Sequence, residues 1–205
     1  MSILKEILNA VLGRSKIEHV AEQIGHPRLL HISDTPSQFY TELSRIIKEL
    51  KPDYIIHTGD LADNIKIGLY PSSMVKYKHE VKKLIQILDS SGAKKVVITL
   101  GNHDDHEYLN SLGKGLLIYE GLGILELEGI TVAFSHYSKD LEKVTADLRL
   151  YGHDLEDIED NGSSQLNLNG IVSMSIIDLV TLDVKKIEYP IGTDNARLNK
   201  KKIGI

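Results

Sequence analysis

The sequence contains no cysteine, so the chain can form neither disulfide bonds nor thiolate metal sites. A reducing cytoplasm is the compartment that we expect for such a chain. No apolar run approaches the roughly 20 residues of a transmembrane helix, and we expect no membrane as a partner. Positive charge is not in excess either, since the net charge is −5 and no basic block is long enough to follow a nucleic-acid backbone. Nucleic acid is therefore not an expected partner.

What the chain does have is the composition of a folded domain. It has 205 residues, of which 41% are apolar and 26% charged, enough for one soluble domain with a substantial core. Residues 1–27 begin with apolar residues at helical spacing, which predicts a helical extension that packs on the domain or on a partner, such as a second copy of the chain. Charged residues interrupt that apolar pattern, which argues against a signal peptide. Residues 193–205 are expected to form a flexible C-terminal tail.

From residue 28 onward, strand and helix patterns alternate. Strands are predicted at 28–33, 53–58 and 94–100, and helices at 36–50 and 72–92. This order predicts an α/β fold with a parallel core. After about residue 115 the pattern changes to short strands with glycine turns, followed by a helix at 139–146, a strand at 148–153 and hairpins from 164 to 190. We expect one domain, residues 28–192, with two packed sheets.

Polar residues follow five of the predicted strands. The segments that carry them are HISDTP, IIHTGDLADN, VITLGNHDDH, VAFSHYS and RLYGHD. Loops at the carboxyl ends of parallel strands commonly build sites, and five such loops in series are hard to ascribe to chance. They offer carboxylate, amide and imidazole donors without sulfur, a mixture that suits Mn²⁺, Fe²⁺, Zn²⁺ or Ni²⁺. The candidate metal ligands are Asp34, Asp60, Asn102, His136 and His153.

The short motifs around these residues resemble those of the calcineurin-like metallophosphoesterase superfamily. They are GDLAD at 59–63, GNHD at 101–104, SH at 135–136 and GH at 152–153, after D-x-P at 34–36. The resemblance covers about residues 29 to 190, and GNHD with an upstream GD is its most specific part. It implies a four-layer αββα sandwich, in which two mixed β-sheets are flanked by helices. This agrees with the alternation of strands and helices in the first half of the chain.

The resemblance also implies a hydrolase, a phosphatase or phosphodiesterase, whose substrate is a phosphorylated small molecule or a nucleotide. In the family, two divalent ions hold a bridging hydroxide that attacks phosphorus in line. His103 would be the catalytic acid, oriented by Asp104. We expect one or two ions per chain, most simply Mn²⁺, with Fe²⁺, Zn²⁺, Ni²⁺ or Mg²⁺ as alternatives. By motif, the ligands would be Asp34 for the first ion, Asp60 between the two, and Asn102, His136 and His153 for the second.

Two residues depart from the family pattern, and both would affect the first ion. Pro36 stands where the family's D-x-H motif has its histidine, and Leu155 stands where G-H-x-H has its second histidine. Three alternatives remain open. The first ion could be held by the two aspartates and a carboxylate from Asp154 or Glu156, a set that favours harder ions such as Mg²⁺ or Mn²⁺. The second site alone could be filled, with slower turnover. Alternatively, the chain could be a catalytically impaired scaffold that binds a protein partner.

Several polar residues near the motifs are expected to have structural roles and not to bind metal. His31 and His57 lie inside strands and are interpreted as core histidines or as residues that support the metal ligands from behind. Asp63 is expected to brace the turn of the GDLAD motif without binding metal. We interpret the segment 64–79 as a solvated helix start, with phosphate binding as the alternative role for its lysines, which are Lys66, Lys76 and Lys78.

Overall fold

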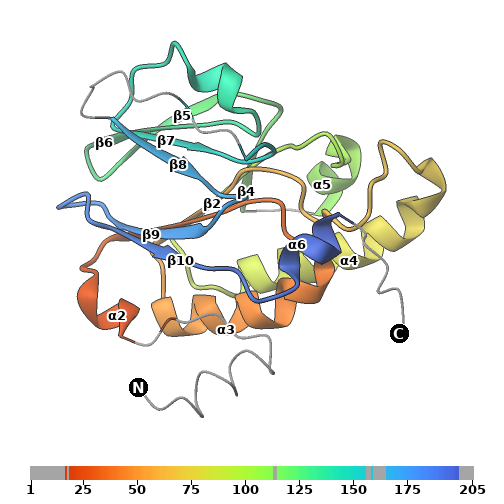
Figure 1. Ribbon diagram of the computed structural model, residues 1–205, viewed down its shortest axis with the longest axis horizontal. Helices are drawn as coiled ribbons and strands as arrows, with labels where there is room; N and C mark the ends of the chain where they lie inside the picture. The colour runs from red at the N-terminus through yellow and green to blue at the C-terminus, as the bar shows by residue number, and fades with distance from the viewer. Residues whose placement is uncertain (1–16, 18, 113–114, 156–157, 159–164, 199–205) are drawn as a thin grey trace.

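Two β-sheets lie face to face, and helices cover the outer face of the larger one (Figure 1). The computed structural model describes residues 17, 19–112, 115–155, 158 and 165–198. Within them, β1 to β4 run parallel, whereas β9 runs antiparallel to both β1 and β10. The order of the larger sheet is β10 (Val184–Ile187), β9 (Met174–Asp178), β1 (Arg28–Ile32), β2 (Tyr54–His57), β3 (Lys95–Thr99) and β4 (Leu116–Tyr119).

The smaller sheet is built from the second half of the chain. Its order is β5 (Gly123–Leu127), β6 (Ile130–Phe134), β7 (Leu148–Tyr151) and β8 (Leu166–Asn169). β5 and β6 form an antiparallel hairpin, and β7 and β8 continue the sheet in parallel. The hairpins predicted between 164 and 190 are therefore only partly correct. β9 and β10 do form one, but β8 joins β7 because Leu166 and Leu168 pack into the layer between the sheets.

The layer between the sheets is filled by buried apolar side chains from both. They include Leu29, Ile56 and Val97 of the larger sheet and Val132, Phe134, Leu148 and Leu150 of the smaller one. In β6 and β7 these residues alternate along the strand, because every second side chain faces the same side. Each such burial stabilises the fold by roughly 1.5–3 kcal/mol. This apolar layer therefore fixes the strand ends of one sheet relative to those of the other.

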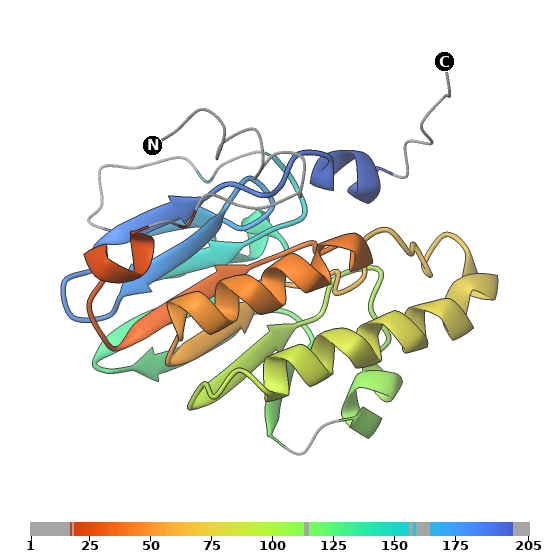
Figure 2. The same cartoon turned by 90° about the horizontal axis from the view of Figure 1, so that it is seen from below.

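Helices from the first half of the chain cover the other face of the larger sheet, as Figure 2 shows from below. The helix α3 (Tyr40–Leu50) follows the 3₁₀ turn η1 (Ser37–Phe39), and α4 (Met74–Asp89) follows η2 (Pro71–Ser73). The helices predicted at 36–50 and 72–92 are thus confirmed. Their buried apolar residues recur every three or four positions and include Leu43, Ile46, Ile47 and Leu50 in α3, and Tyr77, Val81, Leu84, Ile85 and Leu88 in α4. The short helix α5 (His106–Leu112) follows β3.

The outer face of the smaller sheet has a thinner cover. The helix predicted at 139–146 is wrong, since the segment forms only the 3₁₀ turn η3 (Ser138–Leu141). Val144 and Thr145 are β-branched and favour a helix less than unbranched residues do. Leu141 nevertheless packs in a small cluster on this face. The architecture is that of two mixed sheets flanked by helices, as expected. In the described part of the chain, no helix has both the length and the hydropathy needed to span a bilayer.

The end of the described chain differs from the expected flexible tail. Thr193–Arg197 forms α6, with both Thr193 and Arg197 buried. The tail predicted from residue 193 is therefore wrong for this helix, because Arg197 has hydrogen-bond partners in the body of the domain. Residues 199–205 lie outside the described residues.

At the other end, most of the predicted helical extension, residues 1–16, also lies outside the described residues. The part that follows is packed on the domain, since Ile17 and Ile24 belong to the core beneath the larger sheet. It contains the short helix α2 (Val20–Gln23). The buried Arg28 guanidinium donates hydrogen bonds to the carbonyls of Ile24 and Leu50, which joins this segment to the end of α3.

His31 and His57 are fully buried and neutral. Burial lowers the pKa of each to about 3, because an imidazolium would lose its hydration there. The Gly59 N–H donates to His57 Nδ1 at 3.2 Å, so the ring proton lies on Nε2, which donates to Thr35 Oγ1 at 2.9 Å. Thr35 Oγ1 in turn donates to the Leu61 carbonyl. The interpretation of both as core histidines is confirmed, and His57 also links the loops after β1 and β2.

These buried histidines predict acid sensitivity. The unfolded chain takes up protons below the ordinary histidine pKa of about 6.5, whereas folded His31 and His57 stay neutral down to a pKa of about 3. Their contribution to stability is complete above pH 6.5 and is lost as the pH falls from 6.5 toward 3. For metal-free protein, we expect His31→Asn to reduce the loss of unfolding free energy between pH 7.5 and pH 5 by about 1–2 kcal/mol. Urea denaturation at both pH values measures it.

The matched control is His79→Asn, because the His79 side chain is exposed. This variant should lose as much stability between the two pH values as the wild type does. The prediction concerns the pH dependence and not the absolute stability, so a general loss of stability in His31→Asn does not interfere. An unchanged pH dependence in His31→Asn would contradict it.

Candidate metal centre

Five loops at the carboxyl ends of strands in both sheets converge on one side of the molecule. The loops after β1 and β2 are joined along their backbones, since the Asp34 N–H donates to the Gly59 carbonyl at 2.9 Å and the Asp63 N–H to the Thr35 carbonyl at 3.1 Å. Neighbouring parallel strands end at the same edge of a sheet, which explains why distant motifs meet. The predicted ligands sit in these loops: Asp34 after β1, Asp60 after β2, Asn102 after β3, His136 after β6 and His153 after β7.

One set of ligand atoms gathers around the buried His136, and we call Asp60, Asn102, His136 and His153 the histidine group. The Nδ1–H of His136 donates to the Thr58 carbonyl at 2.7 Å, which leaves a lone pair on Nε2. That Nε2 lies 3.1 Å from Asn102 Oδ1, 3.0 Å from His153 Nδ1 and 3.8 Å from Asp60 Oδ2. The structure thus brings these four predicted residues together around His136 Nε2.

A second set consists of Asp34, Asp60 and Asp63, which we call the carboxylate group. Its three buried side chains offer oxygen atoms within 4.8 Å of one another. Burial and then repulsion from neighbouring carboxylates raise the pKa of Asp60 well above its usual value, and the pKa of Asp63 is raised for the same reasons. The half-buried Lys66 pairs with Asp63 and partly offsets this effect.

Both groups fit divalent cations by the chemistry of their donors. In the histidine group, the Nε2 lone pair of His136 faces the Asn102 amide oxygen, and two acceptors at that distance repel each other unless a cation lies between them. In the carboxylate group, a cation would relieve the repulsion that raises the carboxyl pKa values. Asp60 belongs to both groups, as a bridging ligand would.

Asp63 was expected to brace the turn without binding metal, but its side chain belongs to the carboxylate group. Its position in the sequence could have indicated this role, because a residue three positions after Asp60 in a turn can point to the same side of the turn as Asp60. Asp154, one of the expected replacement carboxylates, belongs to neither group within the described residues. Its side chain is more than half exposed, with Oδ1 3.7 Å from His153 Nε2. Glu156, the other replacement, lies outside the described residues.

His103 borders the metal centre and is nearly buried. Its backbone N–H donates to Asp60 Oδ1 at 2.9 Å, and its Nε2 accepts a hydrogen bond from Asn102 Nδ2 at 2.9 Å. Its Nδ1 is buried and has no hydrogen-bond partner among the described residues. Burial, followed by the nearby Lys66 ammonium, lowers the pKa of His103. The ring is therefore neutral near pH 7 when the pocket holds no anion.

Asp104 was expected to orient His103, but its carboxylate lies against the turn after β2 instead. GNHD forms a tight turn in which the Asp104 N–H donates to the Gly101 carbonyl at 3.3 Å, and the Asp104 carboxylate is bound by backbone N–H groups of the neighbouring turn. Burial raises the pKa of Asp104, and the N–H donors oppose that rise. Asp104 is thus a positioning residue for the Asp60 turn. Its carboxylate accepts hydrogen bonds from the N–H groups of Asp60 (2.8 Å), Leu61 (3.0 Å) and Gly101 (2.9 Å) and from the Tyr77 hydroxyl (3.0 Å).

Two glycines allow the carboxylates to approach neighbouring backbone. A Cβ on Gly101 would lie 2.2 Å from Asp60 Oδ1, and a Cβ on Gly152 would lie 2.4 Å from Asp34 Oδ2. Both separations are far shorter than a van der Waals contact. Any larger residue at these positions would displace a candidate ligand, which gives a physical reason for glycine in GNHD and GH.

Arg197, near the end of the described chain, holds the turn that carries Asp34. Its Nε donates to the Asp34 carbonyl at 2.7 Å, its Nη2 to the Ser33 carbonyl at 3.3 Å and its Nη1 to the Ile171 carbonyl at 2.7 Å. The guanidinium also stacks on the Tyr189 ring, 4.1 Å from the centroid. Sequence reasoning missed Arg197 because no motif surrounds it and it lies 163 residues from Asp34.

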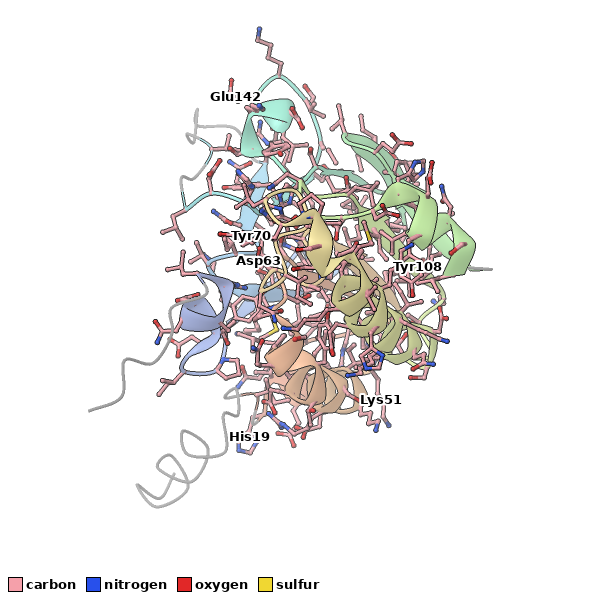
Figure 3. The ribbon with its side chains drawn as sticks, turned by 90° about the vertical axis from the view of Figure 1, so that its right-hand side faces the viewer. His19, Lys51, Asp63, Tyr70, Tyr108 and Glu142 are labelled. Atoms are coloured by element: carbon pink, nitrogen blue, oxygen red, sulfur yellow. The ribbon has the colours of Figure 1, made fainter. Side chains whose placement is uncertain are left out.

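A pocket of about 970 Å³ opens over the centre, on the side that carries Asp63 and Tyr70 in Figure 3. Pro36 instead lines a separate cavity beside α6. The pocket therefore brings His103 and all the candidate ligands except the fully buried His136 to a surface that a substrate could reach. The site residues that line it are Asp34, Asp60, Asp63, Asn102, His103 and His153.

The sequence matches the calcineurin-like phosphoesterase family over residues 27–183. This range covers most of the chain, so the protein belongs to that family, as the motifs indicated. Phosphoester hydrolysis and binding of divalent metal ions are properties of the family. No curated protein matches the sequence.

Solved structures include similar folds. YfcE, a phosphoesterase from E. coli, is 14% identical, with a TM-score of 0.52 over 80% of this chain and 99% of that one. A metallophosphoesterase from Sphaerobacter thermophilus is 13% identical, with a TM-score of 0.47 over 84% of this chain and 93% of that one. At 14% identity, the likeness to YfcE shows the fold alone.

The contacts of Asp104 predict that Asp104→Asn weakens the metal centre. Asparagine has the same shape but turns an amide group toward N–H donors, and each buried donor left unpaired costs about 1–3 kcal/mol. We expect the unfolding free energy to fall by about 2–4 kcal/mol. Titration calorimetry should also show weaker binding of Mn²⁺, because the Asp60 turn is no longer fixed. Urea denaturation measures the first effect.

The neighbouring Asp105→Asn is the matched control. Asp105 caps α5 by accepting the Tyr108 N–H at 2.7 Å, and asparagine caps a helix about as well as aspartate does. The control should therefore keep its stability and its Mn²⁺ affinity. If Asp104→Asn were as stable as Asp105→Asn and bound Mn²⁺ as tightly, the positioning role would be wrong.

Proposed function

We propose that the protein is a metal-dependent phosphoesterase that hydrolyses a phosphomonoester or phosphodiester. One observation carries the proposal: the unprotonated Nε2 of His136 faces Asn102 Oδ1 at 3.1 Å, with Asp60 Oδ2 3.8 Å away. Lone pairs so directed repel one another unless a cation lies among them. Membership of the family supports phosphoester hydrolysis as the use of that cation.

The two groups of ligands would hold ions of related preference. The histidine group offers nitrogen and oxygen donors, which suit Mn²⁺, Fe²⁺ or Zn²⁺, and the carboxylate group offers oxygen alone, which suits Mg²⁺ or Mn²⁺. Because Mn²⁺ suits both donor sets, we propose it as the ion. When bound, such ions lower the pKa of water and neutralise charge on phosphoryl oxygens.

The chain's own residues would bind the phosphoryl group and move the proton. The Lys66 ammonium, which lines the pocket, can bind a phosphoryl oxygen. His103 lines the same pocket and would protonate the leaving oxygen as a general acid. An incoming phosphate is anionic, so it raises the pKa of His103 and favours the protonated ring before the ester bond breaks.

Asp60 belongs to both ligand groups, so Asp60→Asn should remove metal and activity together. We expect Mn²⁺ retained after dialysis, measured by plasma mass spectrometry, to fall close to zero. Hydrolysis of bis-p-nitrophenyl phosphate and p-nitrophenyl phosphate should fall by about 10³-fold or more, since the ions supply several kcal/mol of transition-state stabilisation.

Asp89→Asn is the control for this experiment, because Asp89 is exposed at the end of α4. It should retain both metal and activity. A wild-type protein that takes up no Mn²⁺ and hydrolyses neither ester would contradict the proposal. It would favour the alternative of a scaffold that presents this fold to a protein partner.

The role of His103 predicts a loss that depends on the leaving group. We expect His103→Gln to lower kcat by about 10²–10⁴ for an alkyl phosphoester, because an alkoxide leaves slowly without a proton. For a p-nitrophenyl ester the loss should be much smaller, since that leaving group needs no proton. Bound Mn²⁺ should stay unchanged, and kcat is measured by phosphate release.

The control variant is His106→Gln, whose ring lies outside the pocket residues and pairs with Glu120. It should keep wild-type kcat for both esters. Equal losses for the two esters in His103→Gln would show that His103 is not the acid, while leaving the metal-dependent reaction in place.

A further inference from the structure

The pocket over the metal centre combines a charged floor with an apolar rim. The floor consists of the candidate ligands other than the buried His136, together with His103 and Lys66, and the charged residues Asp154, Asp194 and Arg197 also line the pocket. Around them the pocket is lined by five apolar or aromatic residues, which we call the apolar rim. They are Leu69 and Tyr70 before α4, Leu155 after β7, Ile171 after β8 and Leu198 after α6. Four separate segments of the chain therefore contribute hydrocarbon surface to one opening.

Four of the five rim residues are largely exposed to solvent. The exposed fractions are 67% for Leu69, 61% for Tyr70, 76% for Leu155 and 64% for Leu198. Single exposed apolar residues are common on proteins, but a group of them around one pocket is typical of a binding surface. The Tyr70 N–H donates to the Lys66 carbonyl at 2.8 Å, so this part of the rim is fixed directly beside the floor, as Figure 3 shows for Tyr70 and Asp63.

Leu155 connects the rim to one of the departures from the family motifs. It stands two residues after His153, where the motif G-H-x-H has its second histidine. A histidine there would offer a nitrogen donor to the floor, whereas leucine offers only hydrocarbon. The loop that lacks this donor therefore carries an apolar contact surface at the edge of the same pocket.

We propose that the substrate is a phosphoester whose ester group is a bulky hydrocarbon, held by the apolar rim while the phosphoryl group lies on the floor. This inference rests on the phosphoesterase function proposed above. A pocket of about 970 Å³ lies at the upper end of the range for small-molecule sites and is much larger than a phosphate group needs.

The chemistry of the rim favours a hydrocarbon over a nucleoside. Four of its five side chains have no hydrogen-bonding atom, and Tyr70 has only a hydroxyl. The polar edges of a nucleobase would lose water against this hydrocarbon. The other polar groups that line the pocket offer it little, because Asp154 and Asp194 can only accept hydrogen bonds and the Arg197 guanidinium already donates to backbone carbonyls. A hydrocarbon loses nothing of this kind, and each fully buried methylene strengthens binding by up to about fourfold.

Non-hydrolysable phosphonates separate the contributions of floor and rim. Binding of methylphosphonate, hexylphosphonate and an adenosine phosphonate to the Mn²⁺-loaded full chain is measured by titration calorimetry. We expect hexylphosphonate to bind at least about 30-fold more tightly than methylphosphonate, against a ceiling of about 10³-fold if all five added methylenes were buried. The adenosine compound should bind less tightly than the hexyl compound.

Rim variants test the residues. Leu69→Ser, Tyr70→Ser and Leu155→Ser should each reduce the advantage of the hexyl over the methyl compound by at least about threefold. They should leave the affinity for methylphosphonate within about twofold of wild type. Val75→Ser is the matched control, because Val75 is 82% exposed on α4 and does not line the pocket. It should change neither affinity. These side chains are exposed, so the variants are expected to fold, which circular dichroism checks.

The outcomes distinguish this inference from the function on which it rests. If methyl and hexyl compounds bind equally, or the adenosine compound binds most tightly, the hydrocarbon assignment is wrong while phosphonate binding still supports a phosphoesterase. A hexyl advantage that survives in all three rim variants would also overturn the assignment of the rim. If the chain takes up no Mn²⁺ and binds no phosphonate, both proposals fail together.

Discussion

The metal centre places three acidic side chains beside one another in a buried position. Asp34, Asp60 and Asp63 lie within 4.8 Å of one another, in a place where burial raises the pKa of both Asp60 and Asp63. Such an arrangement is costly unless rigid surroundings hold it and a cation neutralises it. The fold supplies the rigid surroundings by ending neighbouring parallel strands beside one another. The apolar layer between the two sheets then fixes the loops of the smaller sheet above those of the larger one.

Two charged residues from distant parts of the chain hold the turns that carry these carboxylates. Asp104 accepts the N–H groups of the turn after β2, and Arg197 donates to the carbonyls of the turn after β1. One residue supplies acceptors and the other donors, so backbone groups in both buried turns have partners. The matched family range, 27–183, contains the first residue but not the second. The hydrogen bonds that stabilise the two turns therefore also fix the positions of the carboxylates in the centre.

The departures from the family motifs leave a centre with two chemically different sides. The histidine group presents nitrogen and oxygen, and the carboxylate group presents oxygen alone, because Asp63 and not an imidazole lies beside Asp34 and Asp60. Nitrogen donors suit borderline ions and oxygen donors suit hard ones, so the two positions differ in the ions that they favour. Leu155 adds a further difference at the opening of the pocket, where its apolar side chain lies beside charged residues.

The order of strands and helices, the parallel core and the loops that carry Asp60, Asn102, His136 and His153 could all be predicted from the sequence alone. Periodicity, glycine turns and short motifs are local, so a single chain can be read for them. The sequence alone did not predict the partners of Asp104, the place of Asp63 among the carboxylates, or the helix that ends in Arg197. These depend on contacts between residues 44 and 163 positions apart. These features become visible only in the folded chain, because burial and hydrogen-bond partners follow from which loops lie side by side, and local sequence patterns do not contain that information.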